Sequence, residues 1–216
     1  MSSIAVIDYG MGNLHSIAKA LERVAPRDRV LITDRHEVAR RADRVVLPGV
    51  GAIRHCMDQL RGHELAEAVR ELAANRPFLG ICLGLQALLE RSEENGGTAG
   101  LGIFRGAVER FAEGLHERAG DAGIRIPHMG WNRVEPAGAH PLWRGIRRGA
   151  RFYFVHSYYA RADAEGVAAT TDYGVRFASA LARENVFAVQ FHPEKSQQAG
   201  LRLLENFAGW DGRPHQ

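Results

Sequence analysis

A cysteine flanked by glycines is the first feature of this sequence with the potential for chemistry. The stretch F-L-G-I-C-L-G-L-Q at positions 78–86 starts as a buried strand and continues with helical apolar spacing. Cys82 falls at the turn between the two, with Gly80 and Gly84 on either side, which is the pattern of a nucleophile elbow. The N-terminus of the following helix favours a thiolate and presents N–H groups to an oxyanion. The pattern predicts a nucleophile, although a small cysteine that only packs fits this pentapeptide equally well.

A histidine and a carboxylate suited to activate this thiol lie near the end of the chain. The stretch F-H-P-E at positions 191–194 follows the last predicted strand, 186–190. A thiol needs a base to become a thiolate, and the base needs an acceptor that orients it. His192 and Glu194 are two residues apart on an extended segment, so their side chains can point the same way. An isolated H-P-E is an ordinary loop, but together with an elbow cysteine it predicts a triad of Cys82, His192 and Glu194.

Alternating strands and helices must position these groups. Apolar runs predict strands at 4–9, 30–33, 44–47 and 77–81. Helical spacing predicts helices at 14–24, 52–61, 63–74, 83–90 and 197–208. Asn13 and Ser196 are candidate N-caps of the first and last helices, and the glycine-rich segment 93–102 is a predicted loop.

From residue 106 onward short strand-like runs follow one another, at 107–111, 126–134, 152–158, 167–171, 177–181 and 186–190. Such runs are typical of antiparallel strands, whereas the first half has the alternation of a parallel sheet. The sequence therefore predicts a single α/β domain, 1–216, with a mixed, mostly parallel sheet flanked by helices.

The predicted site lies at one edge of this sheet, where the carboxyl ends of parallel strands meet and function collects. The loop P-G-V-G at 48–51 has two glycines after a strand, which lets backbone amides approach a ligand closely. We expect the amides of Leu83 and Val50 to form an oxyanion hole. Because glycines flank Val50, a peptide of this loop can rotate, and the hole is expected to be incomplete in the isolated chain.

A second glycine pattern competes with this interpretation. Gly10-x-Gly12 after the first strand, with Asp34 after the second, imitates a dinucleotide-binding fingerprint. The third glycine position holds His15, so the pattern is incomplete, and these glycines are expected to form a tight turn. A non-enzymatic flavodoxin-like module, which binds a nucleotide or senses oxidation through Cys82, stays open as an alternative.

Composition narrows the class of protein. Of 216 residues, 45% are hydrophobic and 25% charged, which is typical of a soluble globular protein. The net charge is only +3, so the basic cluster at 144–151 is expected to be a solvated loop or partner face rather than a nucleic-acid site. The apolar run at 4–7 is too short for a signal peptide or a membrane span. Cys56 and Cys82 suggest neither a disulfide framework nor a metal site, so we expect a cytoplasmic protein without metal or cofactor.

Three motifs together resemble the class I glutamine amidotransferases: P-G-V-G at 48–51, G-I-C-L-G-L-Q at 80–86 and F-H-P-E at 191–194. The resemblance covers essentially the whole chain. It implies a triad of Cys82, His192 and Glu194 that hydrolyses L-glutamine to glutamate and ammonia through a thioester. Gln86 lies four residues after Cys82 and shares its helical face. The residues expected to hold glutamine are Gly51, Gln86, Ser157 and Tyr158, the last two mainly on the resemblance.

Within this family, three further stretches are similar to the glutaminase subunits of imidazole glycerol phosphate synthase: D-Y-G-M-G-N-L at 8–14, P-H-M-G-W-N at 127–132 and V-H-S-Y at 155–158. The resemblance implies a heterodimer with a (β/α)8-barrel cyclase subunit of histidine biosynthesis, which receives the ammonia directly. The residues expected at that interface are Asn13, Met129, Trp131 and Lys195. The glutaminase of another amidotransferase, for instance of anthranilate or pyridoxal phosphate synthesis, is the nearest alternative.

Overall fold

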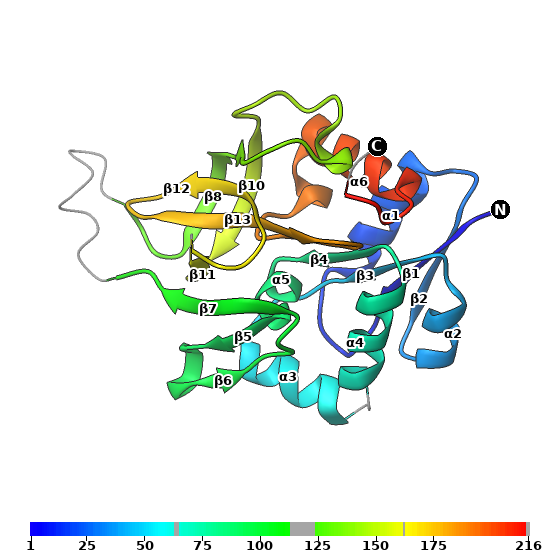
Figure 1. The fold of residues 1–216 in the computed structure, drawn as a ribbon, viewed down its shortest axis with the longest axis horizontal. Helices are drawn as coiled ribbons and strands as arrows, with labels where there is room; N and C mark the ends of the chain where they lie inside the picture. Colours follow the sequence, from blue (N-terminus) through cyan, green and yellow to red (C-terminus); the bar gives the residue numbers. More distant parts are fainter. Residues whose placement is uncertain (63–64, 113–123, 162, 215–216) are drawn as a thin grey trace.

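The computed structural model describes residues 1–62, 65–112, 124–161 and 163–214 (Figure 1). Its helices are α1 (Leu14–Val24), α2 (His36–Arg41), α3 (Ile53–Gly62), α4 (Leu65–Asn75), α5 (Leu83–Leu88) and α6 (Gln197–Gly209). The first strands are β1 (Ser3–Ile7), β2 (Arg29–Thr33), β3 (Arg44–Leu47), β4 (Phe78–Ile81), β5 (Leu89–Ser92) and β6 (Thr98–Ala99). The later strands are β7 (Phe104–Arg110), β8 (His128–Arg133), β9 (Glu135–Pro136), β10 (Arg151–His156), β11 (Tyr158–Arg161), β12 (Val167–Asp172), β13 (Arg176–Arg183) and β14 (Val186–Val189).

One large mixed sheet forms the centre of the fold. Among the described residues its order is β2-β1-β3-β4-β14-β13-β11-β7-β5-β6, with β12 beside β13 and β9 beside β12. The strands from β2 to β14 are parallel to their neighbours. From β14 onward the pairs with β13, β11 and β7 are antiparallel. The predicted α/β class, with antiparallel strands added to a parallel sheet, is confirmed.

The first strand shows why both faces of the sheet are covered by helices. Ile4 and Val6 belong to the core on the side of α1 and α6, whereas Ala5 and Ile7 belong to the core on the side of α2, α3 and α4 (Figure 1). Successive side chains of a strand point to opposite faces, so a strand buried on both faces reads as an unbroken apolar run. This burial fixes the register of the parallel strands and with it the edge where the site lies.

The predicted strand 152–158 is divided at Ser157, which is a correction. Residues up to His156 form β10, which pairs with β8 in a separate two-stranded sheet. From Tyr158 the chain continues as β11 between β7 and β13 of the large sheet. The chain therefore crosses from one sheet to the other at Ser157, and a continuous apolar pattern does not reveal such a crossing.

Two further boundaries differ from expectation, since tertiary pairing overrides local pattern. The helix predicted at 83–90 ends at Leu88, because Leu89–Ser92 pairs with β7 as β5. The segment 93–102 is not all loop, because Thr98–Ala99 pairs with β5 as β6. The first two residues of the helix predicted at 63–74 lie outside the described residues.

Neither predicted N-cap makes a capping hydrogen bond through its side chain. The amide of Asn13 instead reaches Glu194, with 3.5 Å between Nδ2 and Oε1. The hydroxyl of Ser196 donates to the His192 carbonyl at 2.6 Å and accepts from the Tyr153 amide at 2.9 Å. Both side chains therefore serve the His192–Glu194 segment rather than a helix end.

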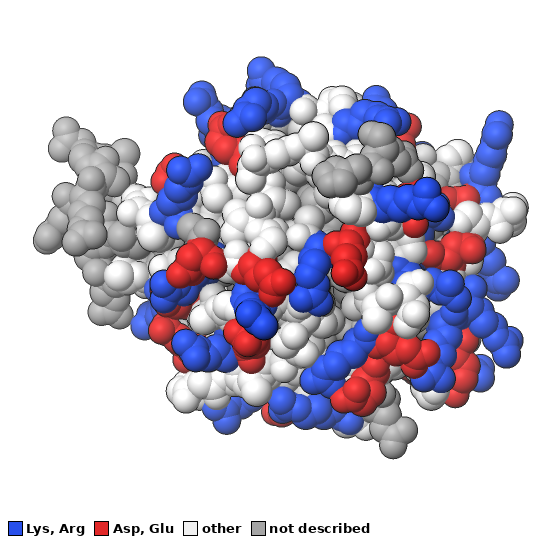
Figure 2. All heavy atoms as spheres, viewed as in Figure 1, with Lys and Arg blue, Asp and Glu red and all other residues white. Residues whose placement is uncertain are grey.

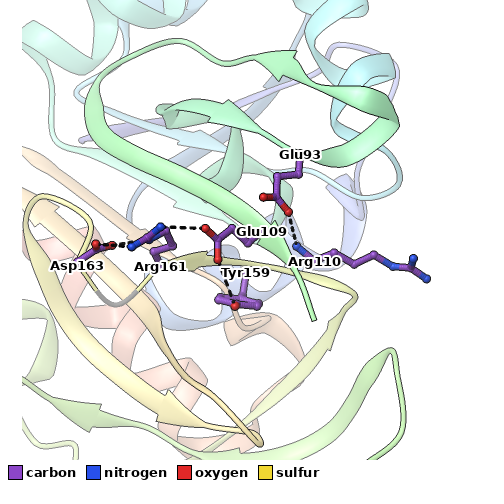
Figure 3. A network of polar contacts seen from close by, with 6 residues as sticks. All are labelled: Glu93, Glu109, Arg110, Tyr159, Arg161 and Asp163. Carbon is purple, nitrogen blue, oxygen red and sulfur yellow. Dashed lines mark hydrogen bonds and ion pairs between the residues drawn. The ribbon is translucent and has the colours of Figure 1, made fainter. Parts of the chain in front are cut away.

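A surface network fastens β11 to β7 (Figure 3). Arg161 pairs with Glu109 at 3.1 Å and with Asp163 at 2.8 Å, and the hydroxyl of Tyr159 donates to Glu109 at 3.5 Å. Exposed pairs of this kind each contribute little stability, so the main-chain pairing of the two strands carries most of the attachment. Because β11 begins at Tyr158, the network holds one wall of the site described below.

Charges of both signs are interleaved over the face shown in Figure 2. No helix in the described part of the chain combines the length and apolar character needed to cross a bilayer.

Candidate active site

Cys82 lies on the sharp turn between β4 and α5, as the elbow pattern predicts. Its backbone has φ of 55° and ψ of −110°, a region that residues other than glycine rarely adopt. The Cys82 amide donates to the Val189 carbonyl at 2.7 Å, and its carbonyl accepts from the Leu85 amide at 3.0 Å. Such strain persists where the surroundings determine it, and it is concentrated at functional sites.

Close packing leaves little room for side chains beside Cys82. A Cβ at Gly84 would lie 2.1 Å from the Leu47 carbonyl oxygen, and one at Gly80 would lie 3.2 Å from the Cβ of Ala188. Gly49 is equally tight, since its Cβ would lie 2.7 Å from the Cβ of Leu83. The elbow is therefore pressed against both neighbouring strands and the 48–51 loop.

His192 and Glu194 form a buried pair. Their Nδ1 and Oε1 atoms are 2.9 Å apart, and their side chains are 2% and 0% exposed. The geometry differs in one respect from the predicted extended segment, because Pro193–Lys195 forms a 3-10 turn with His192 just before it. The turn, held by the Ser196 hydroxyl on the His192 carbonyl, brings the carboxylate beside the imidazole.

The electrostatics of this pair favour a protonated imidazole. Burial by itself would lower the pKa of His192, but its interactions with Cys82 and Glu194 outweigh burial and raise this pKa to about 10. Nε2 of His192 is buried and has no hydrogen-bond partner among the described residues. Since Nδ1 is held by Glu194, Nε2 is the ring nitrogen free to exchange a proton at the site.

A cavity of about 350 Å³ opens above the cysteine. Every residue predicted for the nucleophile, the base, the oxyanion hole or the substrate site lines it. These residues are Cys82, His192, Val50, Leu83, Gly51, Gln86, Ser157 and Tyr158. Glu194 stands behind His192 and is not in the lining. The structure thus brings together groups that are up to 142 residues apart, from Val50 to His192.

The loop at 48–51 is anchored by a residue that the sequence analysis did not single out. The hydroxyl of Tyr9, a side chain only 1% exposed, donates to the Pro48 carbonyl at 2.7 Å. Three residues further on, Gly51 has φ of +92°, and Val50 just before it is 38% exposed. The loop is therefore fixed at its start and turns sharply at the cavity.

A pair of buried histidines, which the sequence analysis missed, adjoins the cavity. His156 lines the cavity, and its Nδ1 lies 2.8 Å from the Tyr158 carbonyl, which can only accept. Nδ1 therefore carries the proton, and Nε2 accepts from Nδ1 of His128 at 2.9 Å. Burial lowers the pKa of His128 to about 4, and burial together with the charge of His128 lowers that of His156 to about 3. The signal for this pair in the sequence was one histidine in each of two predicted strands, which pair with each other in the structure.

Glu94 also lines the cavity, although its segment was predicted as a plain loop. Its Oε2 accepts from the Ile53 amide at 2.9 Å, which fixes the carboxylate in place. Among the described residues that line the cavity it is the only acid. No group of three or more metal-ligating side chains occurs in the described parts of the chain.

The residues predicted to contact a partner lie close to this site. Met129 and Trp131 are 62% and 38% exposed on β8, where Trp131 pairs with Tyr153 of β10. The Tyr153 ring lies 6.1 Å from that of Trp131 and 5.9 Å from Nζ of the exposed Lys195. We call Trp131, Tyr153 and Lys195 the aromatic cluster. Asn13, the fourth predicted contact, is half-buried beside Glu194.

Fold and site together define the class of protein. Residues 5–209 match the family model for glutamine amidotransferase class-I, and the chain belongs to this family. It is 61% identical to imidazole glycerol phosphate synthase subunit HisH of Methylococcus capsulatus over 98% of both chains. It is 58% identical to subunit HisH 1 of Pseudomonas aeruginosa over 99% of both.

Solved structures with low identity share the fold. A putative GMP synthase protein of Thermoplasma acidophilum matches with a TM-score of 0.69 at 21% identity, covering 97% of this chain and 93% of that one. A structure described as a glutamine amidotransferase matches with a TM-score of 0.70 at 19% identity, covering 95% and 99%. The fold is that of class I glutamine amidotransferases.

The elbow packing predicts a sharp effect of Gly84→Ala. In an ordinary helix this change is favourable by about 1 kcal/mol, but here the new methyl group meets the Leu47 carbonyl. We expect the free energy of unfolding to fall by about 2 kcal/mol in urea titrations. Gly138→Ala is the control, because nothing lies within 4 Å of its Cβ. Equal stability of the two variants would contradict the packing argument.

The histidine pair predicts how stability depends on pH. Both pKa values lie below the ordinary 6.5, so the unfolded chain takes up protons that the folded chain does not as the pH falls. Unfolding free energy should drop by roughly 1.5 kcal/mol for each imidazole between pH 6.5 and about 5. His192 has the opposite sign: its contribution is complete below pH 6.5 and is lost toward pH 10.

Urea titrations at several pH values test this. His128→Asn should halve the slope of stability against pH, while His55→Asn, at an exposed position of α3, should leave it unchanged. A flat profile for the unaltered protein between those pH values would show that the pair takes up protons in the folded state.

Proposed function

We propose that this chain is the glutaminase subunit of an imidazole glycerol phosphate synthase, hydrolysing L-glutamine and passing ammonia to a cyclase subunit in histidine biosynthesis. The observation that carries the proposal is that Cys82 and His192 line one cavity and Glu194 pairs with His192 behind it, in a class I amidotransferase. The relatives named as subunit HisH, identical at 58–61% of positions, support the choice of synthase. Two free cysteines are compatible with the reducing cytoplasm in which we place the enzyme.

The reaction follows from the pairing of Cys82 with His192. When His192 has taken the thiol proton, the sulfur attacks the side-chain amide carbon of glutamine, and the carbonyl oxygen becomes an oxyanion. The raised pKa of His192 keeps its proton available at Nε2, from where it passes to the leaving nitrogen as ammonia departs. Glu194 holds Nδ1 throughout. Water then cleaves the glutamyl thioester to glutamate and regenerates the thiol.

The oxyanion is assigned to the backbone amides of Leu83 and Val50. Leu83 is the first residue of α5, so its N–H has no partner within the helix. The Val50 peptide lies in a loop fixed at Pro48 and free to turn at Gly51. Loss of one such donor costs about 3 kcal/mol of barrier, so rotation of this peptide would switch the rate. We propose that partner binding completes the hole.

We propose that the cyclase binds the surface that carries Met129 and the aromatic cluster. Among the described residues, the exposed large hydrophobic side chains are Met1, Val50, Met129 and Trp131. Val50 lines the cavity and Met129 pairs with Val155 of its wall, while Trp131 lies further along β8. Aromatic residues are typical anchors of interfaces. A partner with a (β/α)8 barrel, seated here, would receive ammonia before water protonates it.

Glutamate release tests the proposal. We would measure it for the purified chain alone and with the matching cyclase in the presence of the cyclase's nucleotide ligand. We expect stimulation of at least tenfold by the partner, and loss of activity with Cys82→Ala. Activity that is high alone and indifferent to the cyclase would assign the chain to another amidotransferase. Absence of activity in every condition, with Cys82 unlabelled by a glutamine analogue, would favour a binding module.

Glu94 provides a second test, because free glutamine carries an α-ammonium group that a fixed carboxylate in the cavity suits. We expect Glu94→Gln to raise KM for glutamine roughly tenfold while kcat changes little, in steady-state assays with the partner present. Glu93→Gln is the matched control, since that carboxylate is exposed, is not in the cavity lining and accepts from the Arg110 backbone amide (Figure 3). A fall in kcat at constant KM would contradict this role.

A further inference from the structure

Gln190 is a fully buried polar residue at the end of β14 that lies between the nucleophile and the substrate wall. It is 0% exposed. Its Nε2 lies 3.7 Å from Sγ of Cys82, and its Oε1 accepts from Nε2 of Gln86 at 3.0 Å. Its backbone amide donates to the Ser179 carbonyl at 2.9 Å, so the main chain of Gln190 is fixed as well. A buried carboxamide with both ends engaged needs an explanation beyond packing.

The orientation of this carboxamide is determined by its neighbours. The Tyr158 carbonyl can only accept, and it lies 2.9 Å from the Gln86 side chain, which must therefore present its NH2 group. The second hydrogen of that group points to Gln190, which must present its oxygen. The NH2 group of Gln190 is thereby left to face the sulfur of Cys82.

The placement of Gln190 along the chain matches that of the catalytic base. Gln190 and His192 are two residues apart, and both side chains interact with Cys82. Phe191 between them points elsewhere and packs against Phe152, with 4.1 Å between ring centroids. The end of β14 therefore delivers two polar groups to one sulfur, through the alternation of an extended chain.

We propose that Gln190 is a positioning residue for the nucleophile, whose side-chain N–H holds the Cys82 sulfur and stabilises it as a thiolate. Sulfur is a weak acceptor as a thiol and a stronger one when charged, so the contact gains strength as the thiol loses its proton. The inference rests on the proposed role of Cys82 as nucleophile and adds to the triad a group that donates without exchanging a proton.

The test is the pH dependence of Cys82 alkylation by iodoacetamide, followed by mass spectrometry of the Cys82 peptide. Gln190→Met removes the donor at similar volume. Gln190→Glu retains an acceptor for Gln86 but places a carboxylate against the sulfur. Gln198→Met, on the exposed start of α6, is the control. The titratable groups that face the thiol or line its cavity, namely His192, Tyr9, Glu94 and His156, are unchanged in all three variants.

We expect the alkylation midpoint to rise by about one pH unit in Gln190→Met and by more in Gln190→Glu, with Gln198→Met unchanged. A merely structural loss would change the limiting rate through access, not the midpoint. Midpoints equal to that of the unaltered protein would overturn the proposal. In the unaltered protein, NMR resonances of the Gln190 side-chain amide should shift as Cys82 titrates, and constant resonances would overturn it as well, even if both variants fail to fold.

The outcome is separable from that of the proposed function. Alkylation reads the thiol directly and needs no glutamine. If the chain hydrolyses no glutamine but shows the midpoint shift, the role of Gln190 is supported and the proposed function is contradicted. If the chain hydrolyses glutamine but the midpoints do not shift, the proposed function is supported and the role of Gln190 is contradicted.

Discussion

The close approach of the elbow to its neighbours is the constraint on which the site depends. The left-handed backbone at Cys82 is maintained because Gly84 lies against the Leu47 carbonyl and Gly49 lies against Leu83. These contacts join the ends of β3 and β4, so the position of the cysteine depends on the pairing of these two parallel strands. The loop that carries Val50 is built on the same contacts. The predicted nucleophile and one predicted oxyanion donor are thus fixed by one packing arrangement.

Much of this architecture is readable in the sequence, because it depends on local rules. The apolar runs that became β1, β3 and β4 are buried on both faces, and a tight turn between strand and helix favours glycines beside the cysteine. The proximity of His192 to Cys82 also follows, since the ends of adjacent parallel strands β4 and β14 must meet. The family match bears out the class that these motifs indicate.

What the sequence does not reveal is decided by tertiary pairing. The crossing between sheets at Ser157, the strand at Leu89–Ser92 and the bond from Asn13 to Glu194 each depend on partners far along the chain. The same holds for buried polar groups. Gln190 reads as one more residue of a strand end, and only its contacts with Gln86 and Cys82 distinguish it. Residue type and spacing identify candidate groups, but they do not identify the groups that orient them.

Tyr153 contributes both to the outer surface and to the support of His192. Its ring contributes to the exposed aromatic cluster, while its backbone carbonyl accepts from the His192 amide at 2.9 Å and its amide donates to Ser196. Both bonds use the main chain of Tyr153, so a substitution chosen to refit the outer surface retains them only if β10 keeps its path. Natural variation and laboratory redesign at this position are therefore restricted to side chains that leave the path of β10 intact. The outer surface and the support of His192 are thus linked through one residue.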